Sequence, residues 1–266
     1  MGNCFNKSEK IVPLIESSIK KGNVNIASFA SDLLSNLFSI SSKKNLIKEA
    51  NKKLSKKNIY YIRHAESEHN VLESKYSFIE FEKWNIYDPK LSPNGIQQTN
   101  NIKEQLKENQ IHFDSVFISP LTRAIQTYEL IAKEINDDAE IIVTDFLREV
   151  YVKKFDKNKG KELSKLKEEN KNNKKLNFEF MTKEYWWHDT GEKKDDESED
   201  DELFSLRLKL FILWIAFRPD GNILIISHSN VFVEMQDSYG IYNAEMKQLE
   251  KKDLQNRIIS LFNDYD

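Results

Sequence analysis

Four short strand-like runs, separated by helical patterns, constrain the fold of this 266-residue chain more than any other feature. They lie at 59–62, 115–118, 141–143 and 222–226. Continuous apolar runs of this length are typical of strands that are buried on both faces. Helical spacing appears at 93–108, 121–135 and 203–217, and Ser92 before Pro93 is a typical helix start. The alternation predicts an α/β fold with a mostly parallel sheet covered on both faces.

The composition excludes several other classes of protein. The chain has 1 Cys, so a disulfide framework is excluded and a cysteine-based zinc site is not expected. The longest uninterrupted apolar run, 210–217, is far shorter than a membrane span. The N-terminus lacks a charged segment followed by an apolar one, so we expect no secretory signal and an intracellular protein.

Residues 1–57 form a predicted basic extension that precedes a domain at 58–266. Residues 1–58 hold 11 Lys against 4 acidic side chains, whereas the whole chain has a net charge of −3. Such a segment suits an anionic membrane surface or a nucleic acid, although composition alone favours a solvated, Lys-rich tail. Apolar residues at helical spacing in 24–40 predict an amphipathic helix, which we expect to pack on the main domain rather than on lipid. We expect 41–57 to be a Lys-rich helix or linker.

The first residues favour a membrane anchor. The chain begins Met-Gly-Asn-Cys, so Gly2 would present its amine for N-myristoylation once Met1 is removed, and Cys4 stands at a typical palmitoylation position. One myristoyl chain binds membranes marginally, and Cys4 or the downstream lysines would supply the second signal. Asn6 departs from the usual Ser or Thr. We predict dual acylation at the cytoplasmic face of a membrane, with an accidental Met-Gly start as the alternative.

Charged stretches within about 153–202 interrupt the α/β pattern as insertions. Residues 153–175 are dense in Lys, Glu and Asn, and 192–202 hold eight acidic side chains in eleven positions. Both are expected to be solvated. Residues 176–189 contain five aromatic side chains, so we expect this segment to pack as part of a cap over the cleft. A partner-binding site on its tryptophans is the alternative.

The residues that suit chemistry follow the carboxyl ends of the predicted strands, where ligands bind in parallel sheets. Six side chains are expected to converge there: Arg63, His64, Asn70, Arg123, Glu149 and His228. Guanidiniums bind phosphate oxygens, an imidazole can be a covalent nucleophile, and a carboxyl can protonate a leaving oxygen, so the set fits phosphoryl transfer. The cationic side chains neutralise the developing charge, and we expect neither metal nor cofactor. The remaining histidines are expected on the surface or in structural hydrogen bonds: His69, His112 and His188.

Five sequence blocks form an ordered set. Residues 63–70 read Arg-His-Ala-Glu-Ser-Glu-His-Asn, 88–95 read Asp-Pro-Lys-Leu-Ser-Pro-Asn-Gly, and 119–127 read Ser-Pro-Leu-Thr-Arg-Ala-Ile-Gln-Thr. Shorter blocks at 147–149 and 226–229 read Leu-Arg-Glu and Ile-Ser-His-Ser. In content and order the blocks resemble the histidine phosphatase superfamily, also called the phosphoglycerate-mutase-like family, over roughly 58–240.

The resemblance implies a three-layer α/β/α sandwich and a reaction mechanism. His64 would attack the phosphoryl group in line and become phosphohistidine. Glu149 would be the acid for the leaving group and then the base for water. Gly95 would let a helix start approach the active-site loop. The phosphoryl oxygens would be held by Arg63, Asn70, Arg123 and His228.

The chain after Glu149 differs from glycolytic mutases, which have an Arg-x-Tyr-Gly pattern there. Residues 150–154 read Val-Tyr-Val-Lys-Lys, and the Tyr-Trp-Trp of 185–187 resembles the eukaryotic phosphatase-like branch. Arg207 matches a common family position with a structural role. We therefore expect a phosphomonoester phosphatase with a phosphorylated substrate of unknown class, a membrane as partner, and no nucleic acid. A mutase and a non-catalytic membrane adaptor are the alternatives, and the oligomeric state is open.

Overall fold

The computed structural model describes residues 10–22, 25–188 and 198–265. In this part of the chain the strands form one sheet in the order β4-β3-β2-β5-β1-β6, parallel except for β6, which is antiparallel to β1. All four predicted strands are confirmed, and β4 and β6 were not predicted. The strands are β1 (Asn58–Arg63), β2 (Ser115–Ile118), β3 (Glu140–Val143), β4 (Leu176–Asn177), β5 (Asn222–Ser227) and β6 (Met246–Gln248).

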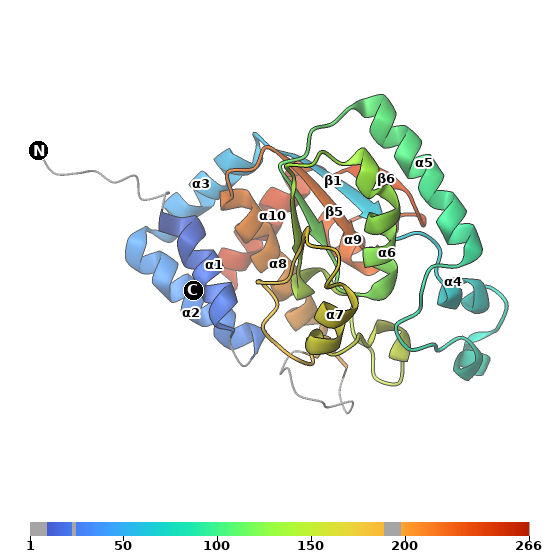
Figure 1. The fold of residues 1–266 in the computed structure, drawn as a ribbon. Helices are drawn as coiled ribbons and strands as arrows, with labels where there is room; N and C mark the ends of the chain where they lie inside the picture. The colour runs from blue at the N-terminus through green and yellow to red at the C-terminus, as the bar shows by residue number, and fades with distance from the viewer. Residues whose placement is uncertain (1–9, 23–24, 189–197, 266) are drawn as a thin grey trace, which may run out of the picture.

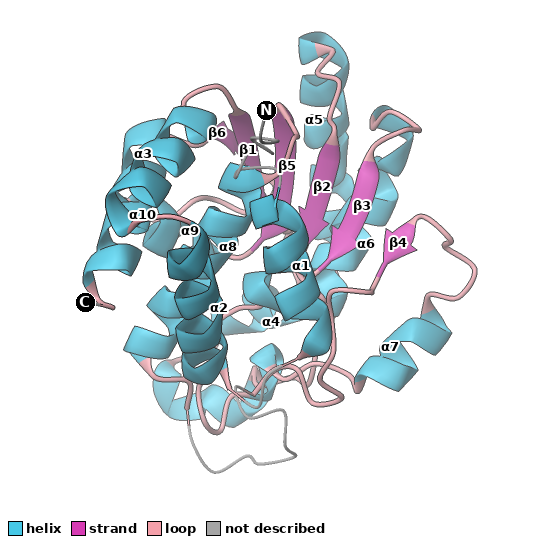
Figure 2. Ribbon diagram, turned by 90° about the vertical axis from the view of Figure 1, so that its left-hand side faces the viewer, coloured by secondary structure: helices cyan, strands magenta, loops and turns pink. Residues whose placement is uncertain are grey.

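Helices cover both faces of the sheet, because strand residues alternate between two separate hydrophobic cores. Tyr61 belongs to the core that includes α8, α9 and α10, whereas its neighbour Ile62 belongs to the core that includes α5, α6 and α7. Figure 2 shows α5 and α6 behind the sheet, and the expected three-layer α/β/α sandwich is confirmed. The helices are α5 (Pro93–Asn109), α6 (Thr122–Ile131), α7 (Leu163–Glu169), α8 (Asp201–Phe217), α9 (Ser229–Gln236) and α10 (Lys251–Asn263).

Two helix boundaries reflect local sequence. The Ser92 hydroxyl accepts the Gly95 N–H at 2.9 Å and caps α5, as its sequence predicts. The helix predicted at 121–135 is shorter than expected: α6 ends at Ile131, and a 3-10 turn (Ala132–Glu134) follows.

The N-terminal extension packs against the domain through α1 (Ile11–Lys21), α2 (Ile26–Ile40) and α3 (Lys43–Leu54). All three helices contact α8, and Figure 1 places them beside α8 and α10. The amphipathic helix is confirmed as α2, and its apolar face packs on protein, as expected. The core therefore continues across residue 57, where the sequence places a domain boundary.

Among the described residues, in the basic segment and elsewhere, no helix is long and apolar enough to cross a membrane. Gly2 and Cys4, on which the predicted acylation depends, lie outside the described residues.

The insertions are less solvated than expected. Leu163 and Leu166 on α7 are buried because they pack into the core that includes α6. Trp186 and Trp187 are also buried, which confirms that the aromatic segment packs. From the acidic stretch, the structure describes 198–202, and within it the Glu199 carboxylate is buried between two arginines.

Replacing Leu37 by Ala should lower the free energy of unfolding by about 2–5 kcal/mol, because the side chain is fully buried between α2 and the rest of the core. Urea unfolding of the full chain would measure this. The matched control is Ser35→Ala on the exposed face of the same helix, which should change stability by less than about 0.5 kcal/mol. Equal stability of the Leu37→Ala and Ser35→Ala proteins would contradict the packing of α2 on the domain.

Candidate active site

The two histidines predicted for the site meet at the carboxyl edge of the sheet. β1 and β5 pair in parallel with Arg63 opposite Ser227, so His64 and His228 leave the sheet side by side. The backbone N–H of His64 donates to the Ser227 carbonyl at 2.9 Å. The centroids of the two imidazoles are 5.1 Å apart, and both rings are buried. Strand pairing thus brings together two residues that are far apart in the sequence.

Short contacts hold the loop that carries His64. Its Nδ1 lies 2.8 Å from the Ala65 carbonyl oxygen. A carbonyl can only accept, so Nδ1 carries the proton and Nε2 keeps its lone pair. α5 presses on the loop at Gly95, where a Cβ would lie 1.9 Å from the Glu66 carbonyl oxygen. The expected close approach at Gly95 is therefore confirmed.

The next turn, α4 (Glu68–Glu73), begins with a capping box formed by Ser67 and Asn70. Asn70 Oδ1 accepts from Ser67 N at 3.1 Å and from Ser67 Oγ at 2.8 Å, and its Nδ2 lies 3.2 Å from His69 Nε2. Asn70 therefore caps a helix as well as facing the site. Burial and the charge of Arg123 lower the pKa of the neighbouring His69 to about 2, so this ring is neutral.

Arg123 reaches the histidines from the first turn of α6. Its Nε donates to His64 Nε2 at 3.2 Å. The other guanidinium nitrogens donate to the Lys157 carbonyl at 2.8 Å and to Asn158 Oδ1 at 2.9 Å. α6 is itself fixed because the Asp88 carboxylate accepts from the backbone N–H and the hydroxyl of its first residue, at 2.9 and 2.6 Å.

These residues surround a cavity of about 380 Å³, a size typical of small-molecule sites. Five of the six predicted residues line it: Arg63, His64, Asn70, Arg123 and Glu149. The sixth, His228, is fully buried and does not form part of the cavity wall. Eleven lining residues were not predicted for the site, and they include His69, Glu73, Phe78, Trp84, Phe155 and Lys157.

Glu149 follows β3 through a 3-10 turn (Asp145–Leu147). Its Oε1 accepts from the Val150 N–H at 2.9 Å, and its Oε2 accepts from the Asn230 N–H at 3.4 Å. Burial raises the pKa of the Glu149 carboxyl despite these bonds. A protonated carboxyl is the form that a general acid needs.

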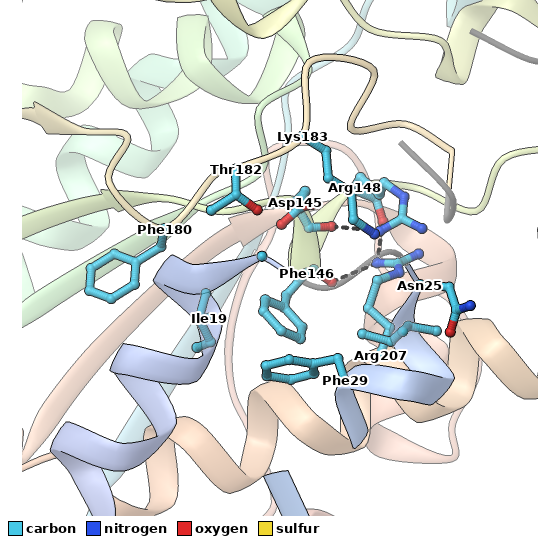
Figure 3. A pocket seen from close by; sticks show the side chains of 12 residues that line it. Ile19, Asn25, Phe29, Asp145, Phe146, Arg148, Phe180, Thr182, Lys183 and Arg207 are labelled. Atoms are coloured by element: carbon cyan, nitrogen blue, oxygen red, sulfur yellow. Dashed lines mark hydrogen bonds between the residues drawn. The ribbon is translucent and has the colours of Figure 1, made fainter. Parts of the chain in front are cut away.

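A buried ion-pair network fixes the backbone around Glu149. Arg207 Nη1 donates to the carbonyls of Phe146 at 2.6 Å and Arg148 at 3.0 Å, as Figure 3 shows. The Glu199 carboxylate accepts from Arg148 at 2.6 Å and from Arg207 at 2.9 and 2.8 Å. Removing Glu199 would leave two buried guanidiniums without their counter-charge, so both arginines depend on this carboxylate.

The N-terminal helices support the same segment. A second cavity, of about 50 Å³, lies between them and the chain that leads to Glu149 (Figure 3). Phe29 of α2 lines it and packs edge-on against Phe146, with ring centroids 6.0 Å apart. The extension thus contacts the segment that positions Glu149.

Burial and neighbouring cations keep the two central histidines neutral. Burial lowers the pKa of His64 well below its usual value, and Arg123 and Arg63 lower it further. Burial and Arg123 likewise lower the pKa of His228. Burial lowers the pKa of Arg123 to about 10, which leaves it charged at neutral pH. The site therefore combines a neutral nucleophilic imidazole with two cations, which can bind and transfer a phosphoryl group.

Part of the unpredicted cavity wall comes from a segment that the sequence places in solvent. Phe155, Lys157 and Asn158 lie in the charged stretch expected in solvent, yet they line the cavity. An aromatic residue in a stretch of charges was the one local signal of this role. The other two histidines, His112 and His188, lie outside the cavity wall.

Comparison with known proteins gives a family match over most of the chain. The sequence model of the histidine phosphatase superfamily (branch 1) matches residues 59–256. Among curated protein sequences, none matches this chain.

Several solved structures are similar in fold at low sequence identity. A candidate alpha-ribazole-5'-P phosphatase from Escherichia coli is 19% identical over 73% of this chain and 90% of that one, with a TM-score of 0.47. A phosphoserine phosphatase from Entamoeba histolytica is 18% identical over 74% of this chain and 99% of that one, with a TM-score of 0.44. A mycobacterial glucosyl-3-phosphoglycerate phosphatase is 16% identical over 73% and 91%, with a TM-score of 0.46.

Proposed function

Because the chain belongs to the histidine phosphatase superfamily, we propose that it hydrolyses phosphomonoesters through a phosphohistidine formed on His64. The observation that carries the proposal is the pairing of a neutral, buried His64 with Arg123, whose Nε lies 3.2 Å from His64 Nε2. A phosphoryl group bound here would meet a nucleophilic nitrogen and a permanent cation together.

The reaction takes two steps. His64 Nε2 attacks phosphorus in line, so an N–P bond forms while the P–O bond to the leaving group breaks, and Glu149 gives its proton to the leaving oxygen. Water then attacks the phosphohistidine, and the Glu149 carboxylate takes a proton from that water. The N–P bond breaks, inorganic phosphate leaves, and His64 returns to its neutral form. The raised pKa of Glu149 supports its role as the acid.

In this proposal Arg63, Asn70 and Arg123 hold the phosphoryl oxygens from the cavity wall, and His228, whose buried ring centroid lies 5.1 Å from that of His64, joins them when a phosphoryl group is bound. Arg63 Nε and His228 Nδ1 are buried and have no hydrogen-bond partner among the described residues. The Ser119 hydroxyl lies 2.6 Å from His228 Nε2 and can donate to it, which leaves the ring proton on Nδ1. Buried donors without partners cost free energy, and phosphoryl oxygens would satisfy both. The two guanidiniums supply the charge, so we propose a reaction that needs no metal.

A mutase would form the same phosphohistidine but would return the phosphoryl group to a second position of a bisphosphorylated molecule. The pairing of Lys157, a further cation in the cavity wall, with Glu73 at 3.3 Å supports the proposal of hydrolysis, because a paired cation attracts a second phosphate group less. Product analysis separates the two reactions, since hydrolysis releases inorganic phosphate.

We also propose that acylation tethers the protein to a membrane, on the ground of the Met-Gly-Asn-Cys start alone. Gly2→Ala removes the acyl acceptor and should move the protein from the membrane fraction to the soluble fraction of cells. Cys4→Ser should do so in part, because one myristoyl chain anchors weakly. The control Asn3→Ala should keep the original distribution. If the Gly2→Ala protein stays in the membrane fraction, acylation of Gly2 is not the anchor.

Replacing His64 by Ala should abolish turnover and the acid-labile phosphoenzyme, because no other group takes the phosphoryl in this mechanism. The measurement is hydrolysis of 4-nitrophenyl phosphate with a chelator present, together with trapping of labelled enzyme. The control is His112→Ala, an exposed histidine outside the cavity, which should keep wild-type activity. Residual phosphoenzyme in the His64→Ala protein would disprove the assignment of the nucleophile.

Replacing Glu149 by Gln should lower kcat/KM about 10²–10⁴-fold for alkyl phosphates, which need protonation of the leaving oxygen. The loss should be much smaller for 4-nitrophenyl phosphate, a good leaving group. In the wild type, kcat/KM for alkyl phosphates should fall as pH rises through the raised pKa of Glu149, because the acid loses its proton there. This fall of kcat/KM with rising pH should be absent from the Glu149→Gln protein. Equal slowing for both substrates would argue against an acid role.

A further inference from the structure

The cavity that contains His64 also has an aromatic wall, formed by Phe78, Trp84 and Phe155. The rings of Trp84 and Phe155 stack with centroids 5.4 Å apart and 27° between their planes. Phe78 packs against Trp84 at 6.3 Å and against Phe155 at 6.1 Å. Asn85 Nδ2 donates to the Lys154 carbonyl at 2.6 Å and joins the two loops that carry the rings. The aromatic wall is therefore one packed unit.

One ring of the wall is exposed. Phe78 is 74% exposed, whereas Trp84 is buried and Phe155 is half-buried. A single exposed aromatic side chain is ordinary on a protein surface. Phe78 differs because its ring packs at an angle against the stacked Trp84 and Phe155 and lines the cavity that holds the phosphoryl-transfer residues. A ligand that covers this ring removes apolar area from water, which favours binding.

The polar groups of the wall are already paired with one another. Lys157 Nζ lies 4.8 Å from the centroid of the Trp84 ring, 5.6 Å from that of Phe155, and 3.3 Å from Glu73 Oε1. The cation is thus held by two rings and a carboxylate. Because Lys157 and Glu73 compensate each other's charge, the wall offers no free charge to a second anionic group, and a sugar would need hydrogen bonds that the rings cannot make. The wall suits a flat, apolar leaving group.

The segment that carries Phe155 also holds the phosphate-binding arginine. Arg123 donates to the Lys157 carbonyl and to Asn158 Oδ1, and Asn158 Nδ2 donates to the Val150 carbonyl at 2.8 Å. The segment 155–158 therefore ties Phe155 to the Arg123 guanidinium, and both line the same cavity. In the phosphate ester of a phenol, the bridging oxygen is bonded directly to the ring, so ring and phosphoryl group lie close together and can occupy one cavity.

We propose that this wall selects phosphomonoesters of phenols, whose ring packs on Phe78 and Phe155 while the phosphoryl group meets His64 and Arg123. The proposal rests on the phosphatase function proposed above and names its substrate class. The chemical step is the one given there, with the phenol oxygen as the leaving atom that Glu149 protonates. A small aryl phosphate and a phosphotyrosine side chain share this chemistry.

The test compares kcat/KM for phenyl phosphate with kcat/KM for propyl phosphate in the full chain. The change of this ratio from wild type to variant cancels the intrinsic reactivity of the two esters. Phe78→Ala should lower the ratio of kcat/KM for phenyl phosphate to that for propyl phosphate about 2- to 10-fold, which is the usual contribution of one aromatic contact. The control is Ile79→Ala, whose side chain is 92% exposed and outside the cavity wall, and which should keep the wild-type ratio. An unchanged ratio in Phe78→Ala, or an equal loss in Ile79→Ala, overturns the proposal.

Binding without turnover separates this proposal from the proposed function. Phenylphosphonate and methylphosphonate carry a P–C bond, which this mechanism does not break, and calorimetry measures their affinities. If phenylphosphonate binds more tightly than methylphosphonate, and Phe78→Ala weakens this preference, the proposed role of the aromatic wall is supported. This holds even if no phosphomonoester is hydrolysed, in which case the proposed function alone fails. Equal affinity for the two phosphonates overturns the proposal, whatever the activity.

A third comparison identifies the source of the phenol. Equal kcat/KM for phenyl phosphate, free phosphotyrosine and a phosphotyrosyl peptide supports a small aryl phosphate as substrate. A value at least about tenfold higher for the peptide supports a phosphotyrosine residue, since contacts beyond the ring must then contribute. A higher kcat/KM for a phosphoseryl peptide of the same sequence overturns the proposal.

Discussion

The parallel pairing of β1 with β5 is the constraint on which the rest of the structure depends. Its register sets Arg63 opposite Ser227, and therefore sets His64 beside His228 at one buried edge of the sheet. A slip of one residue would turn every side chain of the strand to the other face and would exchange the residues that belong to the two helix layers. The hydrogen bonds that define the site thus also define the packing of the whole sandwich.

Burial shifts the pKa values of the side chains at this edge of the sheet. Desolvation lowers the pKa of His64 and raises that of Glu149, so one environment favours both the neutral imidazole and the protonated carboxyl that the proposed mechanism needs. The chain around Glu149 stays in place because Arg207 and Glu199 form a buried pair that binds its backbone. The N-terminal helices pack against the same segment, so the extension takes part in shaping the site.

The sequence predicted those parts of the fold whose signal is local. The four predicted strands carry continuous apolar runs, whereas β4 has two residues and β6 is a short edge strand, so both exist only through pairing with a neighbour. The charged stretch at 153–175 reads as solvated, because its composition hides how few apolar residues are enough to pack α7 on the core. His69 is expected from the sequence on the surface or in a structural hydrogen bond, whereas the structure also places it in the cavity wall through the turn of α4.

By itself the sequence determined the α/β class, the order of the motif blocks, and the side chains that follow the strand ends, because each of these is written in contiguous residues. Only the tertiary structure decided that His228 lies outside the cavity wall, that Glu199 is buried between two arginines, and that Phe78, Trp84 and Phe155 form one wall. These arrangements join residues that are distant along the chain. Their contact energies arise only after the chain has become compact, so no local pattern can record them.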